Sequence, residues 1–150
     1  MIKGFEHVGI SVSNLDRSVA FYRDAFGMEV VAAKSFGGEL YERLLALRGV
    51  KGRVATLEGH NLQIELFEFR IPEPGRGIAN PPLSELGISH FCLLVDDIDV
   101  EYQRLRERGV IFHSPPTGDE AAKAVFARDP DGNAFELIEL LDAAPTTVER

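Results

Sequence analysis

The sequence is short of cysteine, tryptophan and long apolar runs. It contains one cysteine, Cys92, and no tryptophan in 150 residues. A single cysteine excludes an internal disulfide framework and a zinc cluster built from several thiolates. No apolar run approaches the ~20 residues of a membrane span, and residues 1–4 lack the apolar core of a signal peptide. We therefore expect a globular protein of the cytoplasm.

Positive charge is also scarce. The chain has 16 Lys and Arg against 24 Asp and Glu, a formal net charge of −8. This balance argues against a nucleic acid or an anionic membrane as partner. The length fits one domain or two small fused modules. A chain of this size buries enough surface to fold without disulfides.

What the sequence does contain is an internal repeat. Residues 4–7 (GFEH) align with residues 87–90 (GISH), and each histidine stands in a β-rich run, 5–12 or 88–95. A single-face helical pattern follows each run, from Leu15 to Phe26 and from Ile98 to Leu105. The expected N-caps and terminal glycines also match: Asn14 and Asp97, Gly27 and Gly109.

The remainder of each unit predicts three further strands. They are residues 28–33, 53–57 and 64–68 in the first unit, and 110–112, 124–128 and 135–139 in the second. Turns at 59–61 and 129–133 precede the closing strands. The first unit also carries a helical stretch, 39–49. We expect one α+β domain of two tandem βαβββ modules, with module one at 1–70, a Pro/Gly linker at 71–86, module two at 87–141 and a tail at 142–150.

Strand alternation places four polar residues on matching faces. His7 and His90 point away from the side that their helices cover, and Glu65 and Glu136 can do the same from the closing strands. If the modules pack about a pseudo-twofold axis, the four converge. Two imidazoles and two carboxylates suit Zn, Ni, Co, Mn or Fe(II) rather than calcium. An octahedral ion would keep two open positions for water or substrate, as a catalytic metal requires.

Each of these residues taken alone has an ordinary explanation. A single histidine in a strand is usually hydrogen-bonded, and a glutamate in an alternating strand usually faces solvent. Their matched placement in both units favours a site. The remaining histidines, His60 and His113, are predicted to lie on the surface, and Cys92 to be a small buried residue on the His90 face.

Three segments resemble the vicinal oxygen chelate (VOC) superfamily: residues 5–26, 88–109 and 129–139 (DPDGNAFELIE). This superfamily includes glyoxalase I, methylmalonyl-CoA epimerase, extradiol dioxygenases, fosfomycin-resistance transferases and bleomycin-binding proteins. The resemblance implies a partly closed, mixed-sheet cleft formed by two tandem βαβββ modules. Carried over position by position, it implies a divalent metal held by four residues: His7, Glu65, His90 and Glu136.

A ligand set of two His and two Glu resembles the metal lyases and isomerases of glyoxalase I type. The resemblance implies a small carbonyl or hydroxy substrate, a metal-stabilised enediolate, and Glu136 or Glu65 as the base. Short bacterial glyoxalase I enzymes carry an arginine, used to hold glutathione, where this chain has Ser11.

Two alternatives remain open at this point. One is a metal-dependent dioxygenase, which needs room for both O₂ and substrate. The other is a non-catalytic antibiotic-binding protein, for which four aromatic residues could line a pocket: Phe36, Tyr41, Phe67 and Phe69. Family members often form dimers, which implies a homodimer and a site within one chain or shared between two.

Overall fold

The computed structural model describes residues 1–75 and 80–141. Two compact units divide the chain, Met1–Ile78 and Ala79–Arg150, and each is described by itself below. The first unit, module one, contains β1 (Val8–Ser11), α1 (Leu15–Phe26), β2 (Glu29–Gly37), α2 (Glu39–Leu45), β3 (Lys51–Gly59) and β4 (Leu62–Ile71). The second, module two, contains β5 (Phe91–Leu94), α3 (Ile98–Glu107), β6 (Thr117–Gly118), β7 (Ala122–Arg128) and β8 (Ala134–Leu140).

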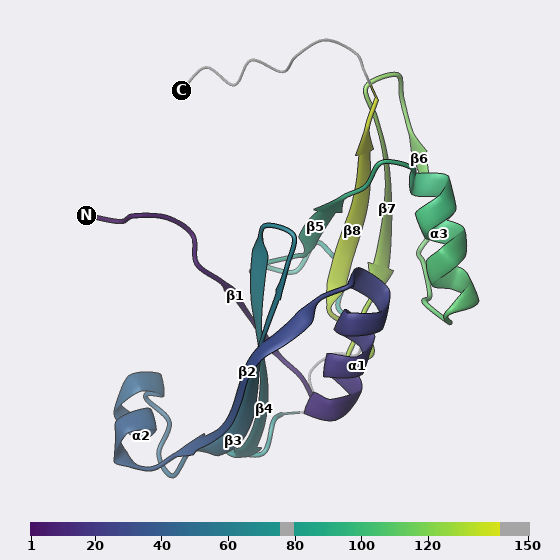
Figure 1. The fold of residues 1–150 in the computed structure, drawn as a ribbon. Coiled ribbons are helices and arrows are strands. Elements are labelled where there is room, and N and C mark those ends of the chain that lie inside the picture. The colour runs from purple at the N-terminus through teal and green to yellow at the C-terminus, as the bar shows by residue number, and fades with distance from the viewer. Residues whose placement is uncertain (76–79, 142–150) are drawn as a thin grey trace. The chain divides into compact units, whose positions relative to one another are not determined.

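Each module forms an open four-stranded sheet with the same strand order (Figure 1). The order is β1-β4-β3-β2 in module one and β5-β8-β7-β6 in module two. The first strand runs parallel to the last, and the other neighbours are antiparallel. The predicted α+β fold of two tandem βαβββ-like modules is confirmed.

Local capping chemistry explains where the helices begin and end. The Asn14 side chain accepts from the backbone N–H of Arg17, and that of Asp97 accepts from Val100. These bonds satisfy N–H groups that have no partner within the helix. Gly27 closes α1 with φ 67°, a left-handed conformation that glycine adopts without steric cost. The sequence predicted both caps and this terminal glycine.

One face of each sheet packs against its helix and forms the core. In module one, Leu57, Ile64 and Leu66 are fully buried together with Tyr22 of α1. In module two, Phe135 and Leu137 are buried with two residues of α3, Ile98 and Leu105. The opposite face of each sheet, called the open face below, carries the predicted site residues.

Module two departs from the prediction at its second strand. The run 110–112 contributes only an isolated bridge, Phe112↔Ala127, and the short β6 lies further along. Pro115 and Pro116 lie between that bridge and β6, and proline cannot donate to a ladder, so pairing is interrupted there. In module one, β4 extends through Ile71, the first residue of the predicted linker. The predicted tail lies outside the described residues.

Residues 39–45 of the predicted helical stretch 39–49 form α2, and Ala46 ends the helix with a φ of 54°. In the described part of the chain, no helix has the length and hydropathy needed to cross a bilayer.

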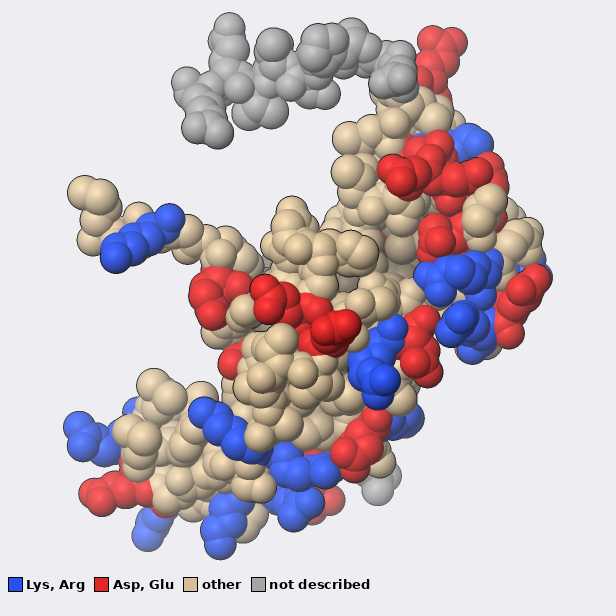
Figure 2. Space-filling view, in the orientation of Figure 1, with Lys and Arg blue, Asp and Glu red and all other residues tan. Residues whose placement is uncertain are grey.

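Figure 2 shows basic side chains gathered over the end of module one that carries α2. Acidic side chains gather around the N-terminal end of α3, where Asp97, Asp99 and Glu101 lie.

Candidate metal centre

The strand register brings one histidine and one glutamate together in each module. Gly9 of β1 pairs with Glu65 of β4, and Cys92 of β5 pairs with Glu136 of β8. Each histidine lies two residues before the paired position, and residues two apart in extended chain share a face. His7 Nε2 lies 3.4 Å from Glu65 Oε2, and His90 Nε2 lies 3.1 Å from Glu136 Oε2. The same geometry therefore occurs twice.

The other ring nitrogen of each histidine contacts the side chain of the preceding residue. His7 Nδ1 contacts the carboxylate of Glu6, and His90 Nδ1 lies 2.7 Å from Ser89 Oγ. A proton on Nδ1 of His7 would be shared with that carboxylate, which leaves the Nε2 lone pair facing Glu65. Metal-binding histidines are commonly oriented in this way through their second nitrogen.

The donor pairs fit a divalent metal ion. Ligand bonds of about 2.0–2.2 Å, as zinc makes to nitrogen and oxygen, place two ligands of one ion about 3.0–3.5 Å apart at octahedral or tetrahedral angles. The nitrogen–oxygen separations of 3.4 and 3.1 Å lie in this interval. Imidazole and carboxylate are also the donor types that transition metals accept together.

Each module supplies two donors. Within either unit, the described residues contain no cluster of three or more His, Cys, Asp or Glu side chains suited to a metal. The convergence of all four residues on one ion therefore stays a prediction.

The two glutamates have different neighbours. Glu65 Oε1 accepts a hydrogen bond of 3.3 Å from the hydroxyl of Thr56, its pairing partner on β3. The pairing partner of Glu136 on β7 is Phe126, whose ring meets the His90 ring edge-on at 4.9 Å. The Glu136 side chain is 16% exposed and that of Glu65 27%. Glu136 thus has the drier and more apolar surroundings.

Cys92 lies on the open face of module two beside Glu136. The residue is exposed, which corrects the prediction that it is buried. Partial desolvation of the thiol, together with the charge and hydrogen bonding of the Glu136 carboxylate, raises its pKa to about 12. The thiol is therefore protonated at neutral pH and is a poor nucleophile.

An aromatic cluster occupies the open face of module one next to Glu65. Phe67 follows Glu65 by two residues on β4, stacks on Phe69 at 5.9 Å and meets Phe36 edge-on at 5.8 Å. Tyr41 of α2 packs against Phe36 at 5.2 Å. The four aromatic residues considered from the sequence therefore form one cluster. Phe36 is buried, so the cluster contributes to the core of module one as well as to its open face.

The two remaining histidines have different environments. His60 Nε2 lies 3.1 Å from the carbonyl oxygen of Phe26, and it occupies a turn with φ 56°. The ring of His113 stacks on Phe126 at 6.4 Å, so it lies on the open face of module two. The prediction that His113 is exposed is correct, but its proximity to the His90 side of the sheet was missed.

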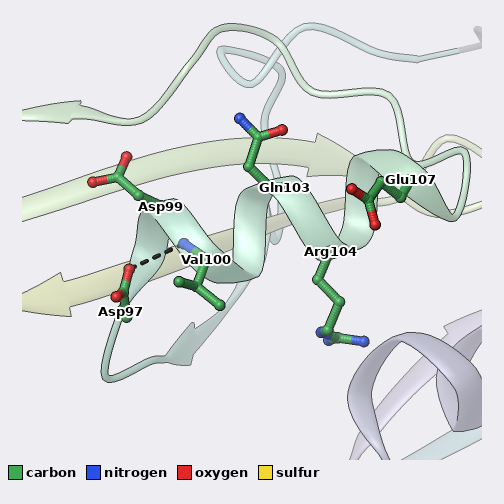
Figure 3. A pocket seen from close by; sticks show the side chains of 6 residues that line it. All are labelled: Asp97, Asp99, Val100, Gln103, Arg104 and Glu107. Carbon is green, nitrogen blue, oxygen red and sulfur yellow. Dashed lines mark hydrogen bonds between the residues drawn. The ribbon is translucent and has the colours of Figure 1, made fainter.

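A hollow on the surface of α3 is lined by Asp97, Asp99, Val100, Gln103, Arg104 and Glu107 (Figure 3). Several of its charged side chains already have partners. Asp97 caps the helix, Arg104 pairs with Glu101 at 2.7 Å, and Asp99 pairs with Lys123 at 2.9 Å. The helix lies on the face of the sheet opposite Glu136, so this hollow is separate from the His–Glu pair.

Comparison with known proteins identifies the family. Residues 4–137 match the model of the Glyoxalase/Bleomycin resistance protein/Dioxygenase superfamily, and the chain belongs to it.

Two curated relatives and one solved structure illustrate the similarity. The chain is 27% identical over 138 residues to lactoylglutathione lyase GLX1 of Arabidopsis thaliana, covering 90% of this chain but only 44% of that protein. It is 30% identical over 149 residues to 2-epi-5-epi-valiolone epimerase of Actinomyces sp., covering 93% and 80% of the two chains. A glyoxalase family protein from Bacillus cereus has the same fold, with a TM-score of 0.85, 22% identity, and coverage of 94% and 96%.

Proposed function

We propose that the protein is a metal-dependent isomerase or lyase of glyoxalase type, acting on a small substrate with carbonyl and hydroxyl oxygens. The observation that carries this proposal is the pair of matching His–Glu contacts, one on the open face of each module. Such a site requires the pairs of two modules to meet, within one chain or across a homodimer.

The proposed ligands are His7, Glu65, His90 and Glu136. A divalent ion held by them would act as a Lewis acid that polarises a substrate carbonyl and makes the neighbouring C–H more acidic. His7 and His90 would bind through Nε2, because Nδ1 of each ring contacts the preceding residue. Thr56 would hold the Glu65 carboxylate in place through its hydroxyl.

Glu136 is the better of the two candidate bases. A general base must reach the proton that it removes, and a carboxylate bonded to a neighbouring hydroxyl is less free to turn toward a substrate. Glu136 has Phe126 and the weakly donating Cys92 thiol beside it, whereas Glu65 is bonded to the hydroxyl of Thr56. We propose that Glu136 removes the proton from the carbon next to the carbonyl and returns it to the adjacent carbon of the enediolate.

Ser11 favours a substrate other than a glutathione adduct. It lies on the open face of β1, two residues beyond Gly9 and paired with Phe67. A serine hydroxyl carries no charge to hold a carboxylate as a guanidinium does. We therefore propose a small hydroxy-carbonyl compound as substrate.

Metal analysis of protein purified without added metal tests the site. Glu65→Ala and Glu136→Ala should each remove most of the bound ion, while Glu107→Ala, an exposed glutamate of α3, should retain it. Wild-type stoichiometry in both site variants would refute the ligand set.

Solvent deuterium exchange then tests the reaction. Glu136→Gln should abolish exchange of the C–H next to the carbonyl of a hydroxy-carbonyl substrate, whereas Glu107→Gln should not. Oxygen consumption coupled to turnover, measured with an oxygen electrode, would instead support a dioxygenase.

A further inference from the structure

The open face of module two carries a second imidazole, His113, beyond the His90–Glu136 pair. The backbone N–H of His113 donates to the Phe126 carbonyl at 2.9 Å. Its neighbour Phe112 bridges to the buried Ala127 and packs on Tyr102 of α3, so Phe112 faces the helix and His113 faces the other way. Glu136, Phe126 and His113 therefore form a row across three adjacent segments.

The Phe126 ring contacts both imidazoles, those of His90 and His113. Its ring stacks on His113 with an interplanar angle of 17° and meets His90 edge-on at 80°. Neighbouring strands are about 4.8 Å apart, so the backbones of Glu136 and His113 are separated by roughly 10 Å. A molecule with one end at Glu136 and the other at His113 would lie over the Phe126 ring.

The contact with Arg128 assigns the tautomer of the neutral His113 ring. Its Nε–H donates to His113 Nε2 at 3.1 Å. Arginine has no acceptor, so Nε2 must be the acceptor, and the proton of the neutral ring lies on Nδ1. Among residues 1–75 and 80–141, Nδ1 of His113 has no hydrogen-bond partner. The ring thus presents one available N–H donor on the open face.

The Arg128 guanidinium places a positive charge beside His113, at the end of the row away from Glu136. Its other two nitrogens donate to the carbonyl oxygens of Gly132 and Pro81, at 2.8 and 2.7 Å. All three acceptors are uncharged, so none of these bonds neutralises Arg128. The buried Asp129 carboxylate belongs to the same turn but accepts its hydrogen bonds from Asp131 and Asn133, not from Arg128. A guanidinium directly behind the imidazole favours an anionic group in front of it.

We propose that His113 is a substrate-positioning residue that binds a carboxylate of the substrate through its Nδ1–H, with Arg128 orienting the ring. The proposal rests on the proposed function and makes it more specific. The substrate is then a small acid whose chelating oxygens lie at the His90–Glu136 end. A few carbon atoms over Phe126 separate those oxygens from a distal carboxylate.

Two ligands that differ only at the distal end test this. 2-Oxoglutarate and 2-oxopentanoate share an oxo-acid head and chain length, but only the first has a distal carboxylate. Calorimetry on zinc-loaded protein should show 2-oxoglutarate binding more tightly to the wild type. His113→Leu should weaken 2-oxoglutarate roughly tenfold to hundredfold, the effect of losing a hydrogen bond to a charged group. Binding of 2-oxopentanoate should be unchanged.

Conservative and control variants separate positioning from structure. His113→Asn should recover most of the affinity, because its amide can place an N–H close to the position of Nδ1. His60→Asn, at the histidine in the module-one turn, should bind both ligands as the wild type does. In the wild type, the imidazole ¹⁵N signals of His113 should shift on adding 2-oxoglutarate but not 2-oxopentanoate.

The outcomes distinguish the two proposals. Equal loss of both ligands in His113→Leu, or no loss of either, would overturn the role of His113 and leave the metal site intact. Failure of the wild type to bind zinc would overturn both proposals together.

Discussion

The reactivity of Cys92 measures the environment of Glu136 without requiring a substrate. The thiol pKa of about 12, raised from an ordinary 9.0, reduces the thiolate fraction at pH 8 from about a tenth to about one part in ten thousand. Because the thiolate is the nucleophile, alkylation by iodoacetamide at pH 8 should be about a thousandfold slower in native protein freed of metal by a chelator than in urea. Cys92 is exposed, so access does not explain the slow reaction.

The pH profile gives the sign of the effect. The alkylation rate should rise with pH and level off only near pH 12 in the native protein, against pH 9 when unfolded. The same difference means that the Cys92 contribution to stability is present below pH 9 and declines between pH 9 and about 12.

Substitutions on β8 isolate the contribution of the carboxylate. Glu136→Gln removes the charge but not the desolvation, so the rate should lie between those of native wild type and unfolded protein. Glu139→Gln alters a glutamate on the opposite face of the strand and should leave the rate unchanged. Mass spectrometry of the labelled peptide follows the reaction. Native alkylation at pH 8 within tenfold of the unfolded rate would refute the raised pKa of the thiol.

Two further predictions concern stability, measured by urea unfolding. Gly52→Ala should cost about 1–3 kcal/mol, the usual cost of overpacking, because an added Cβ would lie 2.4 Å from the Glu68 carbonyl oxygen and 2.5 Å from the Phe36 ring. Gly75→Ala, where nothing lies within 4 Å, should change stability by less than about 0.5 kcal/mol, and equal effects at both glycines would contradict this packing. Asp129→Ala should cost about 3 kcal/mol, because this carboxylate, 5% exposed, accepts three hydrogen bonds from the turn that follows it. Asp129→Asn keeps one acceptor oxygen and should cost about half as much, so a loss below 0.5 kcal/mol in both variants would show that the bonds are dispensable.

The features predicted well from the sequence depend on local chemistry. The N-caps Asn14 and Asp97 need only a side-chain oxygen before an apolar helical stripe, and alternation alone assigns a face to each strand residue. The internal repeat then extended each assignment from one module to the other. The two-module fold followed from these signals.

What the sequence could not provide comes from pairing between distant segments. The contact between His7 and Glu65 depends on the register of β1 against β4, which alternation leaves free to shift in steps of two residues. His113 belongs to a segment that makes one isolated bridge and no continuous strand pairing. The side of the sheet on which it lies is therefore given only by the contact of its neighbour Phe112 with Tyr102. Cys92 was expected to be buried because of its residue type, although alternation had already placed it on the His90 face.

The parallel pairing of first and last strands has a consequence for folding. In each module the His–Glu contact joins segments near opposite ends of the module, β1 to β4 and β5 to β8. Such a contact closes a long loop and has a high sequence separation, so we expect it to form late during folding. A nascent chain released before β4 would carry His7 without Glu65, and an ion that binds the finished pair would stabilise only chains that had completed the module.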